Sequence, residues 1–237
     1  MSDTPKKRAP IQTIADQEQA DSHKIRTQSD VRIRMDRIHE DFEQGFELLR
    51  REENTVTFFG SARLEPDHKY YQQARRLAAR IVQELDATIV TGGGSGIMAA
   101  ANQGAKESHG KSVGMSIELP CEQVTNAYVD ESVDFYYFFS RKVALSFTAR
   151  AFIYFPGGFG TLDEFFEILT LKQTRKIKPL PIILYGREYW EPLLDFIKNT
   201  LSDKFETIGP DDCDLFRLTD SHDEVIDILR ERNINSN

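Results

Sequence analysis

Cysteine and positive charge are scarce in this sequence, and each shortage narrows the possible functions. Only two cysteines occur in 237 residues, Cys121 and Cys213, and they form no Cys-x-x-Cys pair. This gives no disulfide framework and no cysteine zinc site, and it fits a reducing compartment. Lys and Arg number 30 against 38 Asp and Glu, so the net charge of −8 argues against a general nucleic-acid binder.

Long apolar runs are missing as well. No stretch approaches the ~20 apolar residues that a membrane-spanning helix needs, and residues 1–30 lack the apolar core of a signal peptide. Hydrophobic residues make up 40% of the chain and charged residues 29%, which is ordinary for a globular protein. We therefore expect a cytoplasmic protein with no membrane partner and no nucleic-acid partner.

The most informative stretch that is present is a glycine-rich turn, Pro156–Glu164 (PGGFGTLDE). An apolar run leads into it and a helix-period run leads out, so the pattern predicts a strand, a turn and a helix. The three glycines permit a sharp turn and a close approach of a ligand to the backbone. Free N–H groups at a helix N-terminus favour an anion such as phosphate. We expect Glu164 in the first turn of that helix, beside the bound anion.

A purely structural interpretation of the same turn stays open. Thr161 and Glu164 have the spacing of a capping box, in which both side chains only satisfy N–H groups of the helix start. For the loop as a whole we favour ligand binding, because a strand-to-helix turn needs only one or two small residues.

A second glycine-rich loop, Thr91–Ala99 (TGGGSGIMA), also lies between a predicted strand and a predicted helix. Its Gly94-x-Gly96-x-x-Ala99 pattern satisfies a relaxed dinucleotide fingerprint, and Glu118 falls roughly where a ribose-binding acid is expected. A tight turn with close packing of helix on strand is the alternative. The first predicted strand, Thr55–Phe59, ends in the small-residue turn Gly60-Ser61, at the strand end where ligands bind in open parallel sheets.

Alternating strand and helix patterns predict an α/β fold: a Rossmann-like, doubly wound, mainly parallel sheet of five to seven strands with helices on both faces. An amphipathic N-terminal helix, with Ser29 or Asp30 as its N-cap, precedes this sheet as an extension. We expect an aromatic strand over Phe135–Phe139. The expected domain organisation is a flexible segment over residues 1–28, the N-terminal helix over 29–53, one nucleotide-binding catalytic domain over 54–232 and a tail over 233–237.

Two cations, Arg141 and Lys142, open the helix that follows the aromatic run. Positive charge at a helix start opposes the helix dipole, which suggests an anionic partner. The alternative is a pair of solvated surface cations. The five histidines have no metal-ligand spacing, so we expect them at the surface and predict no metal site.

The PGG-x-GT-x-x-E motif, Phe59-Gly60-Ser61, the GGGSGIM loop and Arg141-Lys142 together resemble the Lonely Guy (LOG) family over about Thr55–Phe196. That family consists of phosphoribohydrolases of cytokinin riboside 5′-monophosphates, formerly labelled lysine decarboxylases. The resemblance implies that Arg141 and Glu164 are catalytic and that the turn after Pro156 cradles the phosphate. It further implies substrate contacts from Gly60, Ser61, Gly92, Gly93, Gly94, Gly96, Met98, Lys142, Gly157, Gly158, Phe159, Gly160, Thr161 and Thr170.

The implied reaction is hydrolysis of an N-glycosidic bond through an oxocarbenium-like ribose. A carboxylate can stabilise that cation and orient the attacking water. Arg141 is a poor proton donor, so we expect it to anchor the phosphate or the leaving base. The expected substrate is AMP or a cytokinin riboside monophosphate, with no cofactor. We also expect a homodimer or a larger homo-oligomer, as in the family.

Three departures from the plant-type pattern leave the base specificity and the assembly open. Phe138-Phe139-Ser140 replaces a Met-His-type lead-in before Arg141, the first glycine loop is one residue shorter, and the N-terminal helix is extra. Three other functions stay open: a non-catalytic nucleotide-binding or carrier protein, an NAD-dependent oxidoreductase that rests on the fingerprint alone, and a pyridoxal-dependent decarboxylase. For the last, no Schiff-base lysine stands in a recognisable context.

Overall fold

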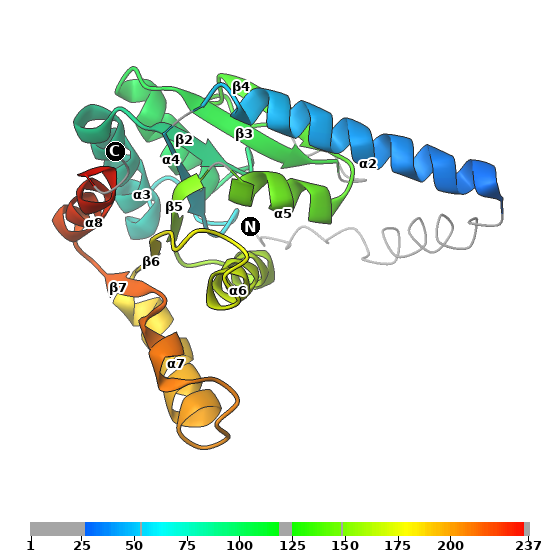
Figure 1. Ribbon diagram of the computed structural model, residues 1–237. Helices are drawn as coiled ribbons and strands as arrows, with labels where there is room; N and C mark the ends of the chain where they lie inside the picture. Colours follow the sequence, from blue (N-terminus) through cyan, green and yellow to red (C-terminus); the bar gives the residue numbers. More distant parts are fainter. Residues whose placement is uncertain (1–26, 53, 119–124, 148, 235–237) are drawn as a thin grey trace, which may run out of the picture.

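A single parallel sheet forms the centre of the molecule (Figure 1). The computed structural model describes residues 27–52, 54–118, 125–147 and 149–234, so the expectations for residues 1–26, for most of the loop around Cys121 and for residues 235–237 lie outside the described residues. The strand order is β4-β3-β2-β1-β5-β6-β7, and every pairing is parallel. The strands are β1 (Thr55–Phe59), β2 (Thr88–Thr91), β3 (Ser112–Ile117), β4 (Glu131–Phe135), β5 (Ala149–Tyr154), β6 (Ile182–Tyr185) and β7 (Arg217–Thr219).

Helices cover both faces of this sheet, as the sequence predicts. The helices are α2 (Gln28–Leu49), α3 (Lys69–Leu85), α4 (Ile97–Glu107), α5 (Phe138–Phe147), α6 (Phe159–Gln173), α7 (Arg187–Phe196) and α8 (His222–Ile234). One core cluster joins the sheet to α3, α4 and α8, and a second joins it to α2, α5, α6 and α7. Strand β5 supplies both, because Ile153 belongs to the first cluster and Phe152 and Tyr154 to the second, as alternation along a strand requires. The Rossmann-like fold is thereby confirmed.

The chain changes direction across the sheet between β1 and β5. From β1 it proceeds outward through β2 and β3 to β4, and it then returns to place β5 on the other side of β1. After a register shift between Thr55 and Val56, the two strands pair residue by residue up to Phe59 and Tyr154, so their carboxyl ends open side by side. In open parallel sheets such a switch point leaves a crevice in which ligands bind.

The predicted aromatic strand over Phe135–Phe139 is wrong. The fourth strand is Glu131–Phe135, and only Phe135, which is fully buried, belongs to both. Phe138 already begins α5. The strand lies at the edge of the sheet and its alternate residues are exposed, so it contains polar residues and lacks the apolar run that signals a buried strand.

The N-terminal helix is present, but its N-cap is Thr27, not Ser29 or Asp30. Thr27 and Asp30 form a reciprocal capping box, in which each side chain accepts a hydrogen bond from the other residue's backbone N–H. The C-terminal half of α2 packs on the body, where Leu48 and Leu49 are buried, whereas its N-terminal half extends away from the sheet (Figure 1).

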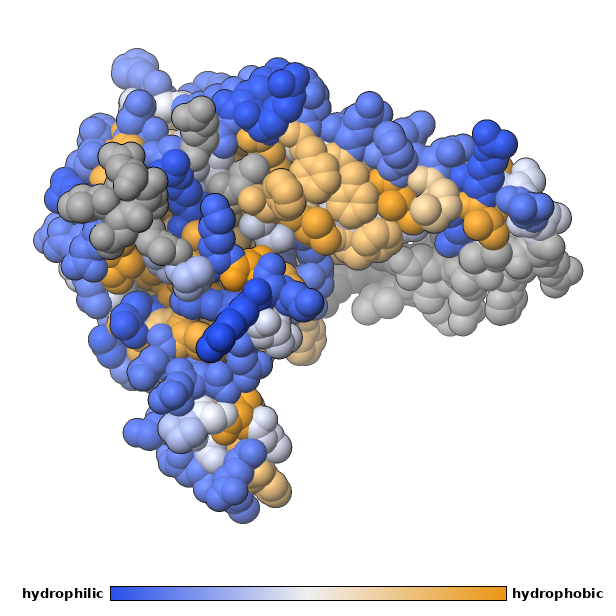
Figure 2. Space-filling view, in the orientation of Figure 1, coloured by the Kyte–Doolittle hydropathy of each residue, from blue (hydrophilic) through white to orange (hydrophobic). Residues whose placement is uncertain are grey.

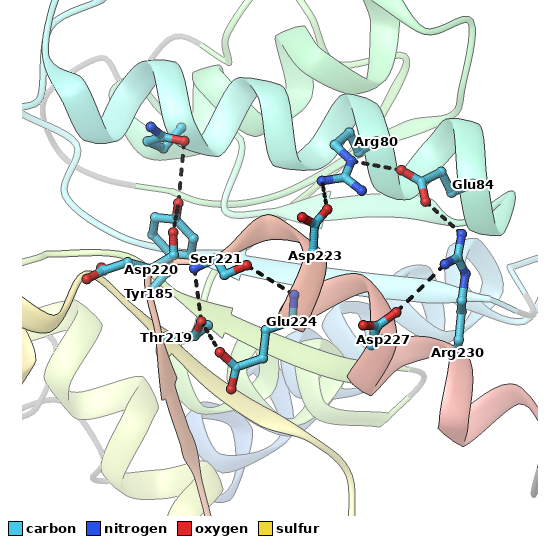
Figure 3. Close-up of polar contacts among 11 residues, drawn as sticks. Arg80, Glu84, Tyr185, Thr219, Asp220, Ser221, Asp223, Glu224, Asp227 and Arg230 are labelled. Carbon is cyan, nitrogen blue, oxygen red and sulfur yellow. Dashed lines mark hydrogen bonds and ion pairs between the residues drawn. The ribbon is translucent and has the colours of Figure 1, made fainter.

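The last helix is fixed to α3 by a network of charges (Figure 3). Arg80 of α3 bonds Asp223 at 2.8 Å, and Arg230 bonds Glu84 at 2.7 Å. Ser221 accepts a hydrogen bond from the N–H of Glu224, as its predicted capping role requires. The carboxylate of Glu224 instead accepts a hydrogen bond from the hydroxyl of Thr219, so the capping box is only half formed (Figure 3).

Candidate active site

A cleft of about 1070 Å³ opens at the carboxyl ends of β1 and β5. The turn after β1, the turn after β5 and the start of α6 form much of its wall. Of the residues predicted to form the site, those that line the cleft are Gly60, Ser61, Gly92, Met98, Arg141, Gly157, Gly158, Phe159, Gly160, Thr161 and Glu164. The switch point of the sheet and the two sequence motifs therefore meet at one place.

The N-terminus of α6 faces this cleft without a side-chain cap. Gly158 is the N-cap residue, and the first intrahelical bond runs from the N–H of Leu162 to the carbonyl of Gly158 at 3.1 Å. The N–H groups of the first three helical residues precede that bond and have no intrahelical acceptor. A Cβ placed on Gly158 or Gly160 would meet nothing within 4 Å. The geometry is that of an anion-binding helix terminus with open space above it.

The capping box of Thr161 and Glu164, the alternative interpretation of this turn, does not form, and the expected place of Glu164 in the first helical turn is wrong. Thr161 is the third residue of α6 rather than its N-cap, and Glu164 is the sixth, so it lies in the second turn and not the first. Thr161 is buried, and a Cβ on Gly157 would lie 2.1 Å from its hydroxyl oxygen. Gly157 is therefore required by the packing of Thr161 below the turn, whereas Gly158 and Gly160 leave room for a ligand.

Arg141 and Glu164 form a buried ion pair in the wall of the cleft. One terminal nitrogen of Arg141 lies 3.6 Å from a carboxylate oxygen of Glu164, and the side chains are only 11% and 14% exposed. The Nε of Arg141 donates to the carbonyl of Met115 at 2.8 Å, at the carboxyl end of β3. A Cβ on Gly92 would lie 2.4 Å from the guanidinium, so this glycine makes room for the arginine.

Burial sets the protonation of both partners. Loss of solvation raises the pKa of Glu164 from 4.5 to about 7, although the neighbouring Arg141 opposes the rise. Burial lowers the pKa of Arg141, and Glu164 opposes that change. An arginine stays charged at neutral pH even so. The pair therefore combines a fixed cation with a carboxyl group that titrates near neutrality, which is typical of catalytic sites.

This raised pKa predicts that Glu164→Gln stabilises the free protein at alkaline pH. The native state binds the Glu164 proton more tightly than the unfolded chain does, so the stability present below pH 4.5 is lost as the pH rises through 7. The full displacement corresponds to about 3 kcal/mol. We expect the melting temperature of Glu164→Gln to exceed that of the wild type by several degrees at pH 8 and by little at pH 5. Equal changes at both pH values would contradict the penalty for burying this carboxylate.

Most of the second glycine-rich loop is used for packing. A Cβ on Gly96, which has a φ of +65°, would lie 2.1 Å from the carbonyl oxygen of Ser61. The N–H of Ile97 donates to that same carbonyl at 3.0 Å. Gly93, Gly94 and Gly96 are buried and do not line the cleft. The loop therefore holds the turn after β1 against α4 and presents only Gly92 and Met98 to the cleft.

Two other residues that the family resemblance implies lie away from the cleft. Lys142 pairs with Asp163 at 2.6 Å and with Glu167 at 3.1 Å, so it joins α5 to α6. Thr170 is exposed, and its hydroxyl donates to the backbone carbonyl of Phe166 at 2.7 Å. Glu118, the candidate ribose-binding acid, is also exposed and does not line the cleft.

The cleft also contains residues that the sequence does not single out. Tyr189 of α7 donates from its hydroxyl to the carbonyl of Gly157 at 2.6 Å and so supports the turn. His68 is the N-cap of α3 and lines the cleft, and His222 is half-buried, with burial lowering its pKa. The expectation that all histidines lie at the surface is therefore wrong. The other unexpected polar residues of the cleft wall are Arg63, Tyr70 and Glu188.

The described part of the chain contains neither a metal-binding cluster of side chains nor a membrane-spanning helix. No group of three or more His, Cys, Asp or Glu side chains there is placed to hold a metal ion. None of the helices described is both long enough and apolar enough to cross a membrane.

Solved structures with this fold include carriers. The molybdenum cofactor carrier protein of Chlamydomonas reinhardtii superposes with a TM-score of 0.56 at 19% identity, covering 77% of this chain and 99% of the carrier. The molybdenum cofactor binding protein of Rippkaea orientalis gives a TM-score of 0.54 at 20% identity, covering 75% and 94% of the two chains. At these identities the likeness concerns the fold alone.

Curated relatives have a common description. The cytokinin riboside 5′-monophosphate phosphoribohydrolase of Rhodococcoides fascians is 28% identical over 155 residues, which are 65% of this chain and 78% of the relative. The enzyme LOG2 of Arabidopsis thaliana, with the same description, is 30% identical over 139 residues, which are 57% of this chain and 64% of the relative.

A family model described as "Possible lysine decarboxylase" matches residues 98–229, more than half of the chain. That range contains both members of the buried ion pair and the whole glycine turn before α6. The protein therefore belongs to this family, the LOG (Lonely Guy) family, to which its phosphoribohydrolase relatives also belong.

Proposed function

We propose that this protein hydrolyses the N-glycosidic bond of a purine nucleoside 5′-monophosphate and releases the free base and ribose 5-phosphate. The observation that carries the proposal is the position of the buried Arg141–Glu164 pair in the same cleft as the uncapped N-terminus of α6. An anion-binding site and a carboxyl group of altered pKa are the two parts that such a reaction needs.

The phosphate is bound by the N–H groups of the turn Gly157–Thr161 in this proposal. The ribose then extends toward Glu164, whose carboxylate stabilises the oxocarbenium-like ring and orients a water molecule. The bond between the anomeric carbon and the base nitrogen breaks, the water oxygen bonds to the anomeric carbon, and the water's proton is released as the base leaves with its electron pair and takes up a proton. Arg141 anchors the phosphate or the leaving base by its charge.

The candidate substrates differ in the base that is released. The described curated relatives act on cytokinin riboside 5′-monophosphates, so AMP and its prenylated derivatives are the substrates to test. The cleft, at about 1070 Å³, is slightly larger than the usual range for small-molecule sites, about 300–1,000 Å³, and its size leaves room for either base.

A non-catalytic nucleotide carrier is the alternative, because carriers for the molybdenum cofactor share the fold. The experiment is incubation of the protein with AMP and with isopentenyl-AMP, followed by chromatography for the free base and an assay for ribose 5-phosphate. Catalytic release of both products in equal amounts supports the hydrolase. Saturable binding of the nucleotides without any product would instead support the carrier.

Self-association is part of the proposal. Figure 2 shows hydrophobic side chains gathered along α2 and over the adjoining α5. The exposed residues on this face are Val31, Met35, Phe138, Phe139, Val143 and Phe147. An apolar face of this extent on one side of a protein marks an interaction surface, and we propose that a second copy covers it. A mass in solution equal to that of one chain would contradict this proposal.

A further inference from the structure

Two of the departures from the plant-type pattern touch each other in the structure. The extra helix α2 packs on the start of α5, and the unusual lead-in Phe138-Phe139-Ser140 is that start. The family model begins at residue 98, so α2 lies outside the part of the chain that it matches. The hydrogen bonds at this contact come from one buried carboxylate, Asp41.

Asp41 is 6% exposed and binds the start of α5 through three hydrogen bonds. Its two oxygens accept from the backbone N–H groups of Tyr136 and Tyr137, each at 3.0 Å. The hydroxyl of Ser140 donates to the same carboxylate. Among the ion pairs of the described residues, none involves Asp41. Its charge is therefore balanced by the N–H groups and the positive end of the α5 dipole.

Close packing surrounds this attachment. A Cβ on Gly45, one turn after Asp41, would lie 2.8 Å from the ring of Phe135 and 3.3 Å from Ala144 of α5. The ring of Phe42 contacts that of Phe139 at 6.5 Å, and the ring of Phe46 contacts that of Phe147 at 4.7 Å, measured between centroids. Helix α2 therefore lies in close contact with Phe135 and with α5 along this face.

The held segment leads directly to the active site. The first backbone bond of α5 runs from the N–H of Arg141 to the carbonyl of Tyr137, whose own N–H is bound by Asp41. Ser140, the third bonded group, precedes Arg141 in the chain. The direction of the Arg141 side chain thus follows from where Asp41 holds the first turn of α5.

We propose that Asp41 is a positioning residue, which fixes Arg141 against Glu164 from a helix outside the family core. The inference rests on the proposed function only for its catalytic readout. Asp41 touches no part of the cleft wall, and it acts through the start of α5 alone. In this proposal the extra helix and the Ser140 lead-in act together, because Asp41 of the helix binds Ser140 and so positions Arg141.

The test compares Asp41→Asn with Asp36→Asn, which changes an exposed carboxylate of the same helix. An asparagine offers one acceptor oxygen where two N–H groups need one each. We expect Asp41→Asn to lower kcat on the order of 100-fold with KM little changed, since small misplacements of a catalytic group have effects of that size. In an Arg141→Ala background, Asp41→Asn should cause no further loss, because the residue through which it acts is gone. A kcat equal to that of Asp36→Asn, or a full additional loss in the Arg141→Ala background, would overturn the proposal.

Ser140→Ala is the milder variant if Asp41→Asn does not fold. It removes one of the three bonds and leaves the charge of Asp41 in place, so a smaller fall in kcat is expected, again absent in the Arg141→Ala background. A structural readout separates this inference from the proposed function. The Nε–H of Arg141 donates to Met115, so its NMR signal should exchange slowly with water in the wild type and rapidly in Asp41→Asn. Unchanged slow exchange would contradict the positioning role, even if the wild type hydrolyses no nucleotide.

Discussion

Glu164→Gln is expected to bind AMP and to lose turnover by about 10²–10⁴-fold, the usual contribution of a catalytic acid–base group. The amide keeps the size of the side chain and its place on α6, but it has no negative charge with which to stabilise an oxocarbenium-like ribose. Phosphate binding should persist, because the N-terminus of α6 is unchanged. The measurements are single-turnover release of ribose 5-phosphate and calorimetric titration with AMP.

The matched control is Glu167→Gln, a carboxylate one turn later on α6 that pairs with Lys142 and does not line the cleft. It should retain nearly all activity. Turnover of Glu164→Gln at the level of this control would remove Glu164 from the mechanism. Glu164→Gln is also expected to stabilise the free protein at pH 8, so its loss of activity could not be attributed to unfolding.

Gly160→Asp has the second large expected effect, on nucleotide binding rather than on folding. A side chain fits at this position, and an aspartate in the first turn of a helix interacts favourably with its dipole, so the protein should fold. The new carboxylate, however, lies where the phosphate is proposed to bind. Two like charges about 4 Å apart repel by about 4 kcal/mol near a protein surface, which corresponds to a loss of about a thousandfold in affinity for AMP.

Gly160→Asn has almost the same shape without the charge, so it serves as the control. The AMP affinities of the two variants should differ by most of that factor, while their melting temperatures stay close. Equal affinities would show that bulk and not charge blocks the site, which would argue against a phosphate at the helix terminus. Binding of AMP by Gly160→Asp at the wild-type affinity would place the phosphate elsewhere.

The main features of the fold could be predicted because local patterns and global structure agree there. Buried central strands such as β5 are continuous apolar runs, and glycine turns end them. The bounds of the edge strand β4 could not be predicted. Glu131 and Asp134 interrupt its apolar pattern, and the adjacent aromatic run has a stronger β propensity. The capping pair Thr27 and Asp30 was within reach of sequence reasoning, since its spacing is that of a capping box.

Helix geometry explains why two residues predicted to contact the substrate lie outside the cleft. Neighbouring residues on a helix point about 100° apart, so Arg141 and Lys142 cannot both face the cleft, and Lys142 turns to Asp163 instead. Thr170 follows Glu164 by six residues, which rotates it by about 240° around α6, away from the carboxylate. Their spacing from Arg141 and Glu164 within each helix therefore argues against a substrate contact from Lys142 or Thr170.

Other cleft residues are brought to the site by tertiary structure alone. His68 and Tyr189 come from the starts of α3 and α7, which are far from both glycine loops in the sequence. Nothing in their local patterns distinguishes them from ordinary helix-start residues. Arg63 is the exception, because it lies two residues after Ser61, at the end of the same small-residue turn, and could have been included on that ground.

The pairing of β1 with β5 also determines when the cleft can exist. These strands are neighbours in the sheet but are separated in the sequence by three other strands and their helices. Closing so long an intervening loop is slow, and contacts of this kind form late in folding. During synthesis, a nascent chain that has emerged only as far as β4 contains the turn after β1 and the second glycine-rich loop, but not the turn after β5 where the phosphate is proposed to bind. Under the proposed function, a bound nucleotide therefore assists only the final stage of folding, and an adenylate-dependent rise in refolding yield should appear only after β5 has docked.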